Sequence, residues 1–332
     1  MLPADDVPMR PTRFFVLACA LGIALSLAGT ASASQLIARN ASGISLEVNA
    51  KGTALVTYRA QGKLTHLLAW GAVNARQRPA SPKIKQVAFK LDYSGGWLHH
   101  RQTWKTFKNT CRAYDGPELA WFVAGCTAPN GSYWALQSWQ TALPDLGLAP
   151  WLQSQKTWWL HLSHWSGDLA KLSVYTDWIY GGRFQEVFGQ YTYMGKGIRG
   201  FGTTRVGAPT DGYGRLLFLD TYNSSYGKGW LRENSFVSHG PPGMFCYGFY
   251  ARNPWLGGYA HPASTPNRKR GPGTGEEYRI TAPGPGVTPD VMWQGAGLHA
   301  YDKRNPADVS LENEMNAERN SIRAGYGKCS HN

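Results

Sequence analysis

Sequence patterns that identify the common enzyme classes are missing from this chain of 332 residues. There is no Gly-x-Ser-x-Gly nucleophile elbow. The glycine-rich stretch at residues 271–275 contains Pro272 and is followed by no helical pattern, which argues against a phosphate-binding loop. Cysteines are few, and none has the Cys-x-x-Cys or Cys-x-x-His spacing of a zinc or redox site. We therefore expect no metal, no nucleotide and no other cofactor.

Long apolar runs are equally scarce, and the one clear example lies near the start of the chain. Phe14–Gly29 is an apolar stretch of 16 residues, preceded by Arg10 and Arg13 and followed by the small residues Thr30–Ala33. This order of charge, apolar stretch and small residues is typical of a secretory signal peptide. We expect residues 1–33 to be removed by cleavage after Ala33. The mature protein should then be secreted, to the extracellular space or the cell envelope.

Two alternatives to cleavage after Ala33 are less favoured by the sequence. The apolar stretch could stay uncleaved as an anchor helix, but it is shorter than the roughly 20 residues that a membrane-spanning helix needs. Lipoprotein processing at Cys19 is disfavoured because only five apolar residues separate Arg13 from Cys19. No later stretch is apolar enough to cross a bilayer, so we expect no transmembrane segment after cleavage.

Four cysteines follow the predicted signal peptide: Cys111, Cys126, Cys246 and Cys329. An even number in an oxidising compartment predicts two disulfides, for which three connectivities are possible. Proximity in the sequence favours the pairs Cys111–Cys126 and Cys246–Cys329. The second pair would tether a polar C-terminal tail.

Helical patterns are rare, whereas turn residues are abundant, with 39 Gly and 20 Pro. Short alternating segments between turns predict an all-β fold, an antiparallel β-sandwich or a jelly-roll-like arrangement, over residues 34–262. Residues 263–332 are predicted to form a Pro/Gly-rich, polar and mostly irregular tail, tethered by Cys329. Within it we expect one strand near Tyr278 and a helix over residues 311–324.

The clearest hairpin in the sequence joins residues 158–165 to residues 169–178 through Ser166-Gly167-Asp168. Alternation in its second arm places Leu172, Val174, Thr176 and Trp178 on one face, as in a half-buried antiparallel strand. His161 and His164 in its first arm are three residues apart, so we expect them on opposite faces and not as joint metal ligands.

Acidic residues are almost absent from one part of the chain, residues 51–112, which we call the basic segment. It contains twelve Lys or Arg residues and a single acid, Asp92, and so carries +11 of the total net charge of +13. A region of one sign attracts anions such as wall polymers, phospholipid headgroups or nucleic acid. The alternative is that these side chains point in several directions and keep the domain soluble.

An enzymatic interpretation rests on four acids that each lie near Trp or Tyr: Asp177, Glu186, Asp220 and Glu233. Two facing carboxylates below an aromatic cleft are what a glycoside hydrolase uses as acid and nucleophile or base. The competing interpretation, which we favour, pairs these acids with Arg183, Arg215 or Arg232.

Aromatic residues are interleaved with the cations of the basic segment, which favours a binding function over catalysis. Cations neutralise a polyanion and release its counterions, while aromatic faces stack on sugar rings. We therefore expect a secreted, non-catalytic binding protein for an anionic polysaccharide or wall polymer. The predicted contact residues are Trp97, Arg101, Trp104, Lys105, Phe107 and Lys108. The sequence does not indicate an oligomeric state.

Overall fold

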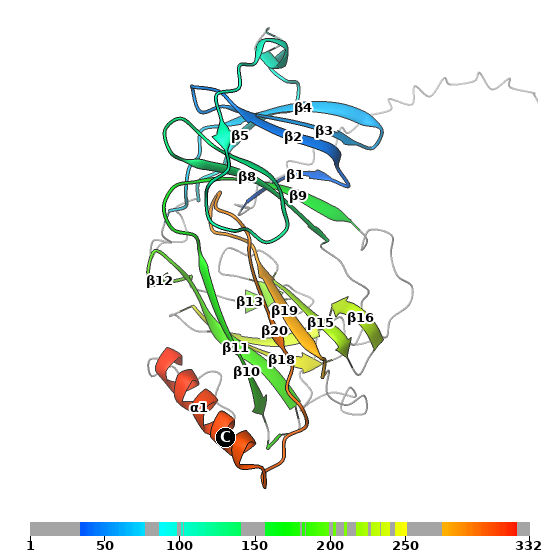
Figure 1. The fold of residues 1–332 in the computed structure, drawn as a ribbon, viewed down its shortest axis with the longest axis vertical. Coiled ribbons are helices and arrows are strands. Elements are labelled where there is room, and N and C mark those ends of the chain that lie inside the picture. The colour runs from blue at the N-terminus through cyan, green and yellow to red at the C-terminus, as the bar shows by residue number, and fades with distance from the viewer. Residues whose placement is uncertain are drawn as a thin grey trace, which may run out of the picture.

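The computed structural model describes residues 34–76, 86–97, 101, 103–140, 157–179, 181–182, 184–198, 202–203, 209–210, 217–224, 227–232, 234–239, 243–250 and 274–323. These residues are mostly β, with four antiparallel sheets of at least four strands, a small two-stranded sheet and one α-helix near the C-terminus (Figure 1). None of the sheets closes into a barrel within the described ranges.

Two of the sheets lie together in the upper part of Figure 1. Sheet 1 has the order β2-β3-β4-β5, with strands Ser42–Val48, Ala54–Ala60, Lys63–Trp70 and Lys90–Asp92. Sheet 2 has the order β1-β9-β8-β7-β6, with strands Gln35–Arg39, Trp158–Trp165, Tyr133–Gln140, Phe122–Thr127 and Arg112–Ala113. A single hydrophobic core, the upper core, takes side chains from both sheets, including Val56 and Leu67 of sheet 1 and Trp134 and Leu162 of sheet 2.

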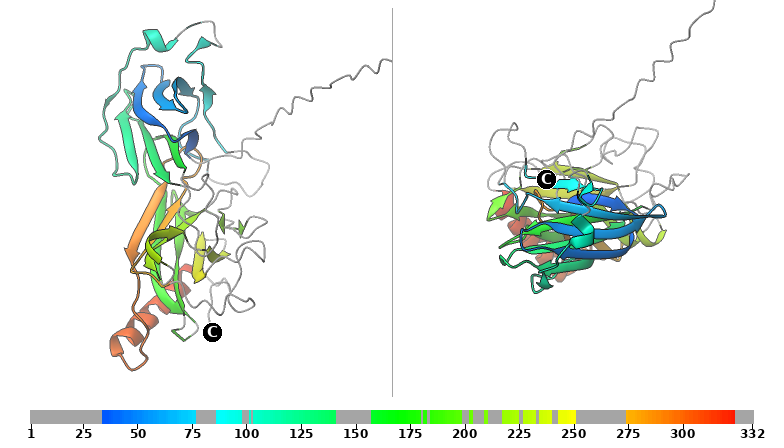
Figure 2. Two further views of the ribbon diagram at one scale, coloured as in Figure 1. Left: turned by 90° about the vertical axis from the view of Figure 1, so that its right-hand side faces the viewer. Right: turned by 90° about the horizontal axis from the view of Figure 1, so that it is seen from above.

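The other sheets lie in the lower part of Figure 1 and also in the lower part of the view turned by 90° (Figure 2, left). Sheet 3 has the order β10-β11-β18-β17, with strands Lys171–Ile179, Phe184–Tyr193, Met244–Tyr250 and Asn234–His239, and β12 (Lys196–Gly197) pairs with β11. Sheet 4 has the order β16-β15-β19-β20, with strands Gly227–Arg232, Phe218–Ser224, Glu277–Ala282 and Val291–Ala296. The two-stranded sheet joins β13 (Gly202–Thr203) and β14 (Pro209–Thr210). The lower core combines Val187, Tyr191 and Phe245 of sheet 3 with Leu219 and Ile280 of sheet 4.

The connection between β19 and β20, residues 283–290, joins the two halves of the molecule. All eight residues are buried, and Val287 is part of the upper core. The backbone N–H of His164 donates to the carbonyl of Val287 at 2.8 Å, and the N–H of Val287 donates to the carbonyl of Asn74 at 3.3 Å. This connecting loop is the tip of the β19–β20 hairpin, and it hydrogen-bonds to His164 and Asn74 of the upper half.

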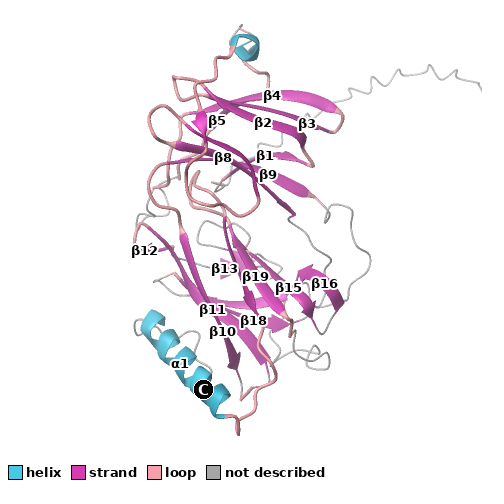
Figure 3. Ribbon diagram, viewed as in Figure 1, coloured by secondary structure: helices cyan, strands magenta, loops and turns pink. Residues whose placement is uncertain are grey.

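The segment predicted as a mostly irregular tail is more regular where the structure describes it, at residues 274–323. It contains β19, the expected strand near Tyr278, together with β20 and the helix α1 (Pro306–Arg323; Figure 3). The helix begins five residues before the predicted position 311. The Oδ1 of Asn305 accepts the N–H of Ala307, and Pro306 occupies the first turn, so these two residues set the start.

The predicted hairpin between residues 158–165 and 169–178 is wrong, although both arms are strands. β9 pairs with β1 and β8 in sheet 2, whereas β10 pairs with β11 in sheet 3. The turn at Ser166-Gly167-Asp168 therefore carries the chain from one half to the other. The second arm does face the lower core with Leu172 and Val174, but α1 covers its other face, where Tyr175 packs.

One predicted disulfide is confirmed and a second cysteine is shown to be bonded. Cys111 and Cys126 are joined, with Cα atoms 5.7 Å apart. Cys246 is also disulfide-bonded. Cys329, the partner that the sequence predicts for it, lies outside the described residues.

Candidate ligand-binding pocket

The outer face of sheet 1 provides the floor of the candidate site. Along β4, Leu67 and Ala69 point into the upper core, so the alternating residues His66, Leu68 and Trp70 point to the opposite face. Leu68 is nevertheless buried, with only 4% of its surface exposed. A segment of chain must therefore cover this face, and the covering segment contains residues 103–110, on which the short 3-10 helix η2 (Thr103–Thr106) lies.

A tight turn after β5 directs the chain back over sheet 1. Its organising residue is Asp92, the one acid of the basic segment. The Oδ1 of Asp92 accepts the N–H and hydroxyl of Ser94 at 2.8 and 2.5 Å, and its Oδ2 accepts the N–H of Gly96 at 3.0 Å. Asp92 is 2% exposed, so its carboxylate forms the turn and leaves the surrounding surface lysines without an acid from this segment.

An aromatic stack fixes the covering segment to β4. The rings of His66 and Trp104 are parallel, with an interplanar angle of 6° and centroids 4.0 Å apart. Gly95 allows this approach, because a Cβ there would lie 2.6 Å from Trp104 and its φ is +66°. The Nζ of Lys105 lies 5.4 Å from the centroid of the Trp104 ring, within cation–π range. Burial lowers the pKa of His66, which favours the neutral imidazole.

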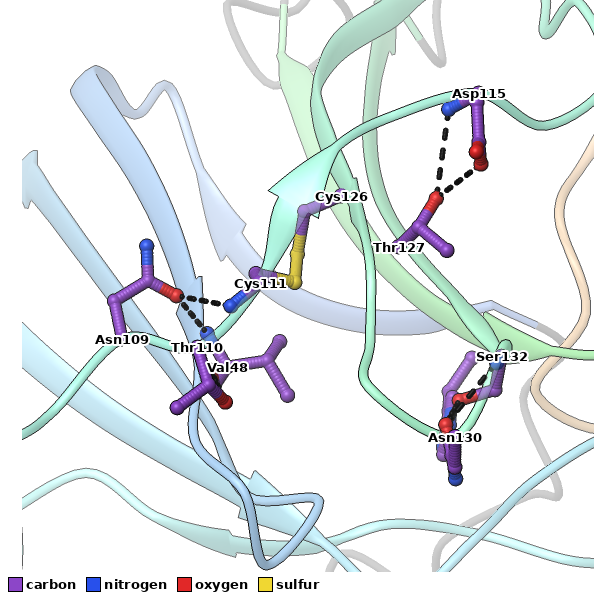
Figure 4. The surroundings of a disulfide bond; sticks show 10 residues. Val48, Asn109, Thr110, Cys111, Asp115, Cys126, Thr127, Asn130 and Ser132 are labelled. Carbon is purple, nitrogen blue, oxygen red and sulfur yellow. Dashed lines mark hydrogen bonds between the residues drawn. A yellow bond between two sulfur atoms is a disulfide. The ribbon is translucent and has the colours of Figure 1, made fainter.

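The far end of the covering segment is held by backbone bonds and by a covalent link. The N–H of Thr110 donates to the carbonyl of Val48 at 2.8 Å, and the Oδ1 of Asn109 accepts the N–H of Val48 at 3.2 Å. The next residue, Cys111, is bonded to Cys126 of sheet 2 (Figure 4). Residues 109–111, at the end of the covering segment, are thus fixed to both sheets of the upper half.

Between the covering segment and sheet 1 lies an open pocket of about 630 Å³. Its aromatic and aliphatic walls come from Leu68, Trp70 and Phe107, and its cations are Lys51 and Lys108. The remaining lining is small or polar, from Asn49, Ala50, Thr53, Thr103, Thr106 and Thr110. A third lysine is close, because Lys90 on β5 pairs in register with Trp70. The pocket therefore combines an apolar floor with lysines at its edge, and its described lining contains no acid.

The charges around the pocket are exposed. Nine of the twelve cations of the basic segment are described, and all nine are exposed: Lys51, Arg59, Lys63, Arg76, Lys90, Arg101, Lys105, Lys108 and Arg112. The ion pairs found among the described residues include none of them. Arg78, Lys83 and Lys85 lie outside the described residues.

The six predicted contact residues lie in three places: in the pocket, in the stack beside it, and at the turn after β5. Phe107 and Lys108 line the pocket, and Trp104 with Lys105 forms the neighbouring stack. Trp97 and Arg101 are exposed on the turn side, Trp97 with 65% of its surface accessible. The sequence reasoning missed the strand residues of the floor, because the covering of sheet 1 depends on contacts that no local pattern shows.

Two of the four candidate catalytic acids converge, but in the interior. Asp177 and Glu186 face each other in register across β10 and β11. Arg319 of α1 donates from its Nη2 to both, to the Oδ2 of Asp177 and, at 2.8 Å, to the Oε1 of Glu186. The two acids are 0% and 1% exposed, and burial raises the pKa of Asp177 to about 6 although Arg319 opposes the shift. The carboxylate pair is therefore buried below α1, where a substrate cannot reach it.

Of the remaining candidate acids, the structure describes Asp220. Asp220 is 1% exposed and accepts the Nη2 of Arg279 at 3.1 Å. Glu233 lies outside the described residues. The described acids thus pair with arginines, as the competing interpretation expects, and the pairs that are described involve Arg279 of β19 and Arg319 of α1. The side chains of Arg183, Arg215 and Arg232 lie outside the description, although Arg232 is opposite Asp220 in the register of β15 and β16.

Possible metal ligands do not cluster in the described ranges. No group of three or more His, Cys, Asp or Glu side chains there could hold a metal ion. His161 and His164 are both buried, and His164 stacks on Trp134 with centroids 3.9 Å apart. No helix among these residues has the length and apolar character needed to cross a membrane.

Comparison with known proteins adds no assignment to this geometry. No protein-family model matches the chain, and no significant match was found among the curated proteins or the solved structures.

Proposed function

We propose that the protein is a non-catalytic binding protein for an anionic polysaccharide, and that the pocket above sheet 1 is its binding site. The observation that carries this proposal is the joint occurrence of Trp70 and Phe107 with Lys51 and Lys108 in one concave lining. An aromatic face binds a sugar ring by stacking, and a lysine at the edge binds a carboxylate or phosphate substituent. These are the two chemical features of an acidic sugar.

The shape of the pocket supports a ligand of this size. A volume of about 630 Å³ falls within the usual range of ligand pockets, roughly 300–1,000 Å³. Its open form suits a segment of a longer chain, since both neighbours of a bound sugar unit could continue into solvent. The exposed cations outside the pocket, including Lys90 and Lys105, would then contact further units of the polymer.

The test is binding to an acidic polysaccharide over a range of salt concentrations. Polygalacturonate and teichoic acid are suitable probes, with uncharged dextran and duplex DNA as comparisons. The double variant Lys51→Ala, Lys108→Ala should bind more weakly. It should also reduce the slope of log K against log salt by about 1.5, because each lost contact removes roughly 0.7–0.9. Phe107→Ala should weaken binding at every salt concentration without changing the slope.

The chain supplies a matched control for charge alone. Arg59 and Lys63 are exposed residues of the basic segment at the other end of the β3–β4 hairpin from Lys51. The double variant Arg59→Ala, Lys63→Ala removes the same two charges without touching the pocket. Equal weakening by the two double variants would reject the pocket and leave only nonspecific charge attraction. Equal affinity for DNA and polysaccharide would reject the sugar preference.

The binding function goes together with export, which we also propose. The Cys111–Cys126 disulfide supports it, since structural disulfides persist in oxidising compartments. Expression in a bacterial host and mass measurement of the secreted material tests cleavage, with an N-terminus at Ser34 as the expected result.

For the fold, we propose that each pair of sheets is a β-sandwich. The support is that sheets 1 and 2 share the upper core and sheets 3 and 4 share the lower core. The sandwich arrangement predicts an angle of about 30° between the mean strand directions of the facing sheets, which X-ray crystallography would measure.

A further inference from the structure

The first described residue, Ser34, lies in a buried polar cluster between the two halves of the molecule. It directly precedes β1, and its side chain is in contact with residues of β9 and of the 283–290 loop. The Oγ of Ser34 donates to the Oδ1 of Asp290 at 2.5 Å and lies 2.6 Å from the Nδ1 of His161. Ser34 is 0% exposed and Asp290 is 2% exposed. The residue at the predicted cleavage site is thus part of the interior.

Among the described residues, His161 is the one side chain beside the carboxylate of Asp290 that can carry a positive charge, and it does so only when protonated. The Oδ2 of Asp290 accepts the Nε1 of Trp139 at 2.8 Å and lies 2.9 Å from the Nδ1 of His161, and its Oδ1 accepts the N–H of Gly284 at 3.1 Å. Among the described residues no Lys or Arg forms an ion pair with it. A buried charge is expensive unless it is paired, so this site is suited to one additional positive group.

The backbone of Ser34 is also in an unfavourable conformation. Its φ is +27°, in the left-handed region that side chains other than glycine rarely adopt. The angle φ exists only while a preceding residue is attached, because it is defined by the carbonyl carbon of that residue. Cleavage of the bond before Ser34 would remove this restriction altogether.

We propose that cleavage after Ala33 creates an α-ammonium group at Ser34 that pairs with the buried Asp290 and locks β1 onto the 283–290 loop. The proposal rests on the proposed export of the chain. Hydrolysis of the Ala33–Ser34 bond by a signal peptidase adds one water, leaves a carboxylate on Ala33, and leaves an amine on Ser34 that takes up a proton.

Geometry and charge both fit this pairing. Covalent geometry keeps the backbone nitrogen of a serine within about 4 Å of its own Oγ. The Oγ of Ser34 lies 2.5 Å from the Oδ1 of Asp290, so the nitrogen lies at most about 6.5 Å from that oxygen. An α-amino group has an ordinary pKa near 8, and a carboxylate at this distance favours its charged form. The described side chains that bond to Ser34 or Asp290 are His161 of β9 and Gln137 and Trp139 of β8. Asp290 is the one acid in this described cluster.

The test compares chains that differ only at the N-terminus. One begins at Ser34, prepared from a fusion that is cut directly before this residue. The second begins at Ala33, and the third is the Ser34 chain with an acetylated α-amine. The chain that begins at Ser34 should have the highest melting temperature, by several degrees. Its α-amine should react with an amine-specific reagent at pH 7.5 at least tenfold more slowly than that of the Ala33 chain.

The same comparison in Asp290→Asn proteins separates ion pairing from relief of backbone strain. If the ammonium pairs with Asp290, the difference between the Ser34 and Ala33 chains should shrink. An unchanged difference would overturn the pairing, and so would equal labelling rates in the wild-type chains. The labelling result needs no variant, so it decides the proposal even if Asp290→Asn fails to fold. None of these measurements involves polysaccharide binding or secretion.

Discussion

Replacing Arg319 by Met should destabilise the protein strongly, because it removes the cation between two buried acids. Arg319 is 4% exposed and donates to Asp177 and Glu186, which are themselves fully buried. Its guanidinium also lies 4.6 Å from the centroid of the Phe188 ring. Met preserves the length of the apolar stem, so the variant chiefly tests the charge.

The expected loss is about 3–5 kcal/mol in the free energy of unfolding, the usual result when one partner of a buried ion pair is removed. For a chain of this size the melting temperature should fall on the order of 10 °C. The loss should be larger at pH 8 than at pH 5, because the two carboxylates left facing each other can relieve repulsion only by binding a proton. Thermal unfolding followed by circular dichroism at both pH values measures it.

Arg304→Met is the matched control for this prediction. Arg304 precedes the same helix and pairs with Asp302 at 3.2 Å, but its side chain is 85% exposed. A surface pair of this kind contributes less than about 1 kcal/mol. If Arg319→Met lost no more than Arg304→Met, the guanidinium would contribute little to the docking of α1, and the reasoning would fail.

Three further variants test other parts of the fold. Burial raises the pKa of Asp177 from 3.8 to about 6, so stability contributed by this group is complete below about pH 4 and lost as the pH rises through 6. Asp177→Asn should abolish this decrease, on the order of 3 kcal/mol, in unfolding measured from pH 4 to pH 7; an unchanged pH profile would refute it. Cys126→Ser opens a crosslink between residues 15 apart and should lower stability by about 3 kcal/mol, measured by urea unfolding without reductant. Gly189→Ala should destabilise by about 3 kcal/mol in the same assay, since its Cβ would lie 1.9 Å from the carbonyl oxygen of Ser173 on the paired strand.

Local patterns were sufficient to predict most strands but not their partners. The meander of β2, β3 and β4 follows from alternating segments separated by Gly52 and Gly62, and the structure confirms it. The apparent hairpin of β9 and β10 fails because a short turn between two strands does not determine whether they hydrogen-bond to each other. β9 instead lies between β1 and β8, where its apolar residues Leu160 and Leu162 enter the upper core.

Long-range contacts explain what the sequence could not show. Residues 283–290 have the composition of an exposed loop, and Val287 is the one aliphatic residue in them. The loop is nevertheless buried, because its polar groups bond to residues far away in the sequence, such as Ser34 and Gln137. The candidate pocket depends in the same way on the covering of sheet 1 by residues 103–110. Its cations and Phe107 were visible in the sequence, and its strand floor was not.

The placement of acids determines what can neutralise the lysines of the pocket. Six acids of the described residues are buried: Asp92, Asp177, Glu186, Asp220, Asp290 and Asp308. Arg319 is the one buried Lys or Arg of the same residues. A buried carboxylate already makes its contacts inside the protein, so it cannot form an ion pair with an exposed lysine. The ion pairs of the described residues include neither Lys51 nor Lys108, so mobile counterions, or a polyanion that displaces them, are available to neutralise these two lysines. This exchange is the quantity that the salt dependence of binding measures.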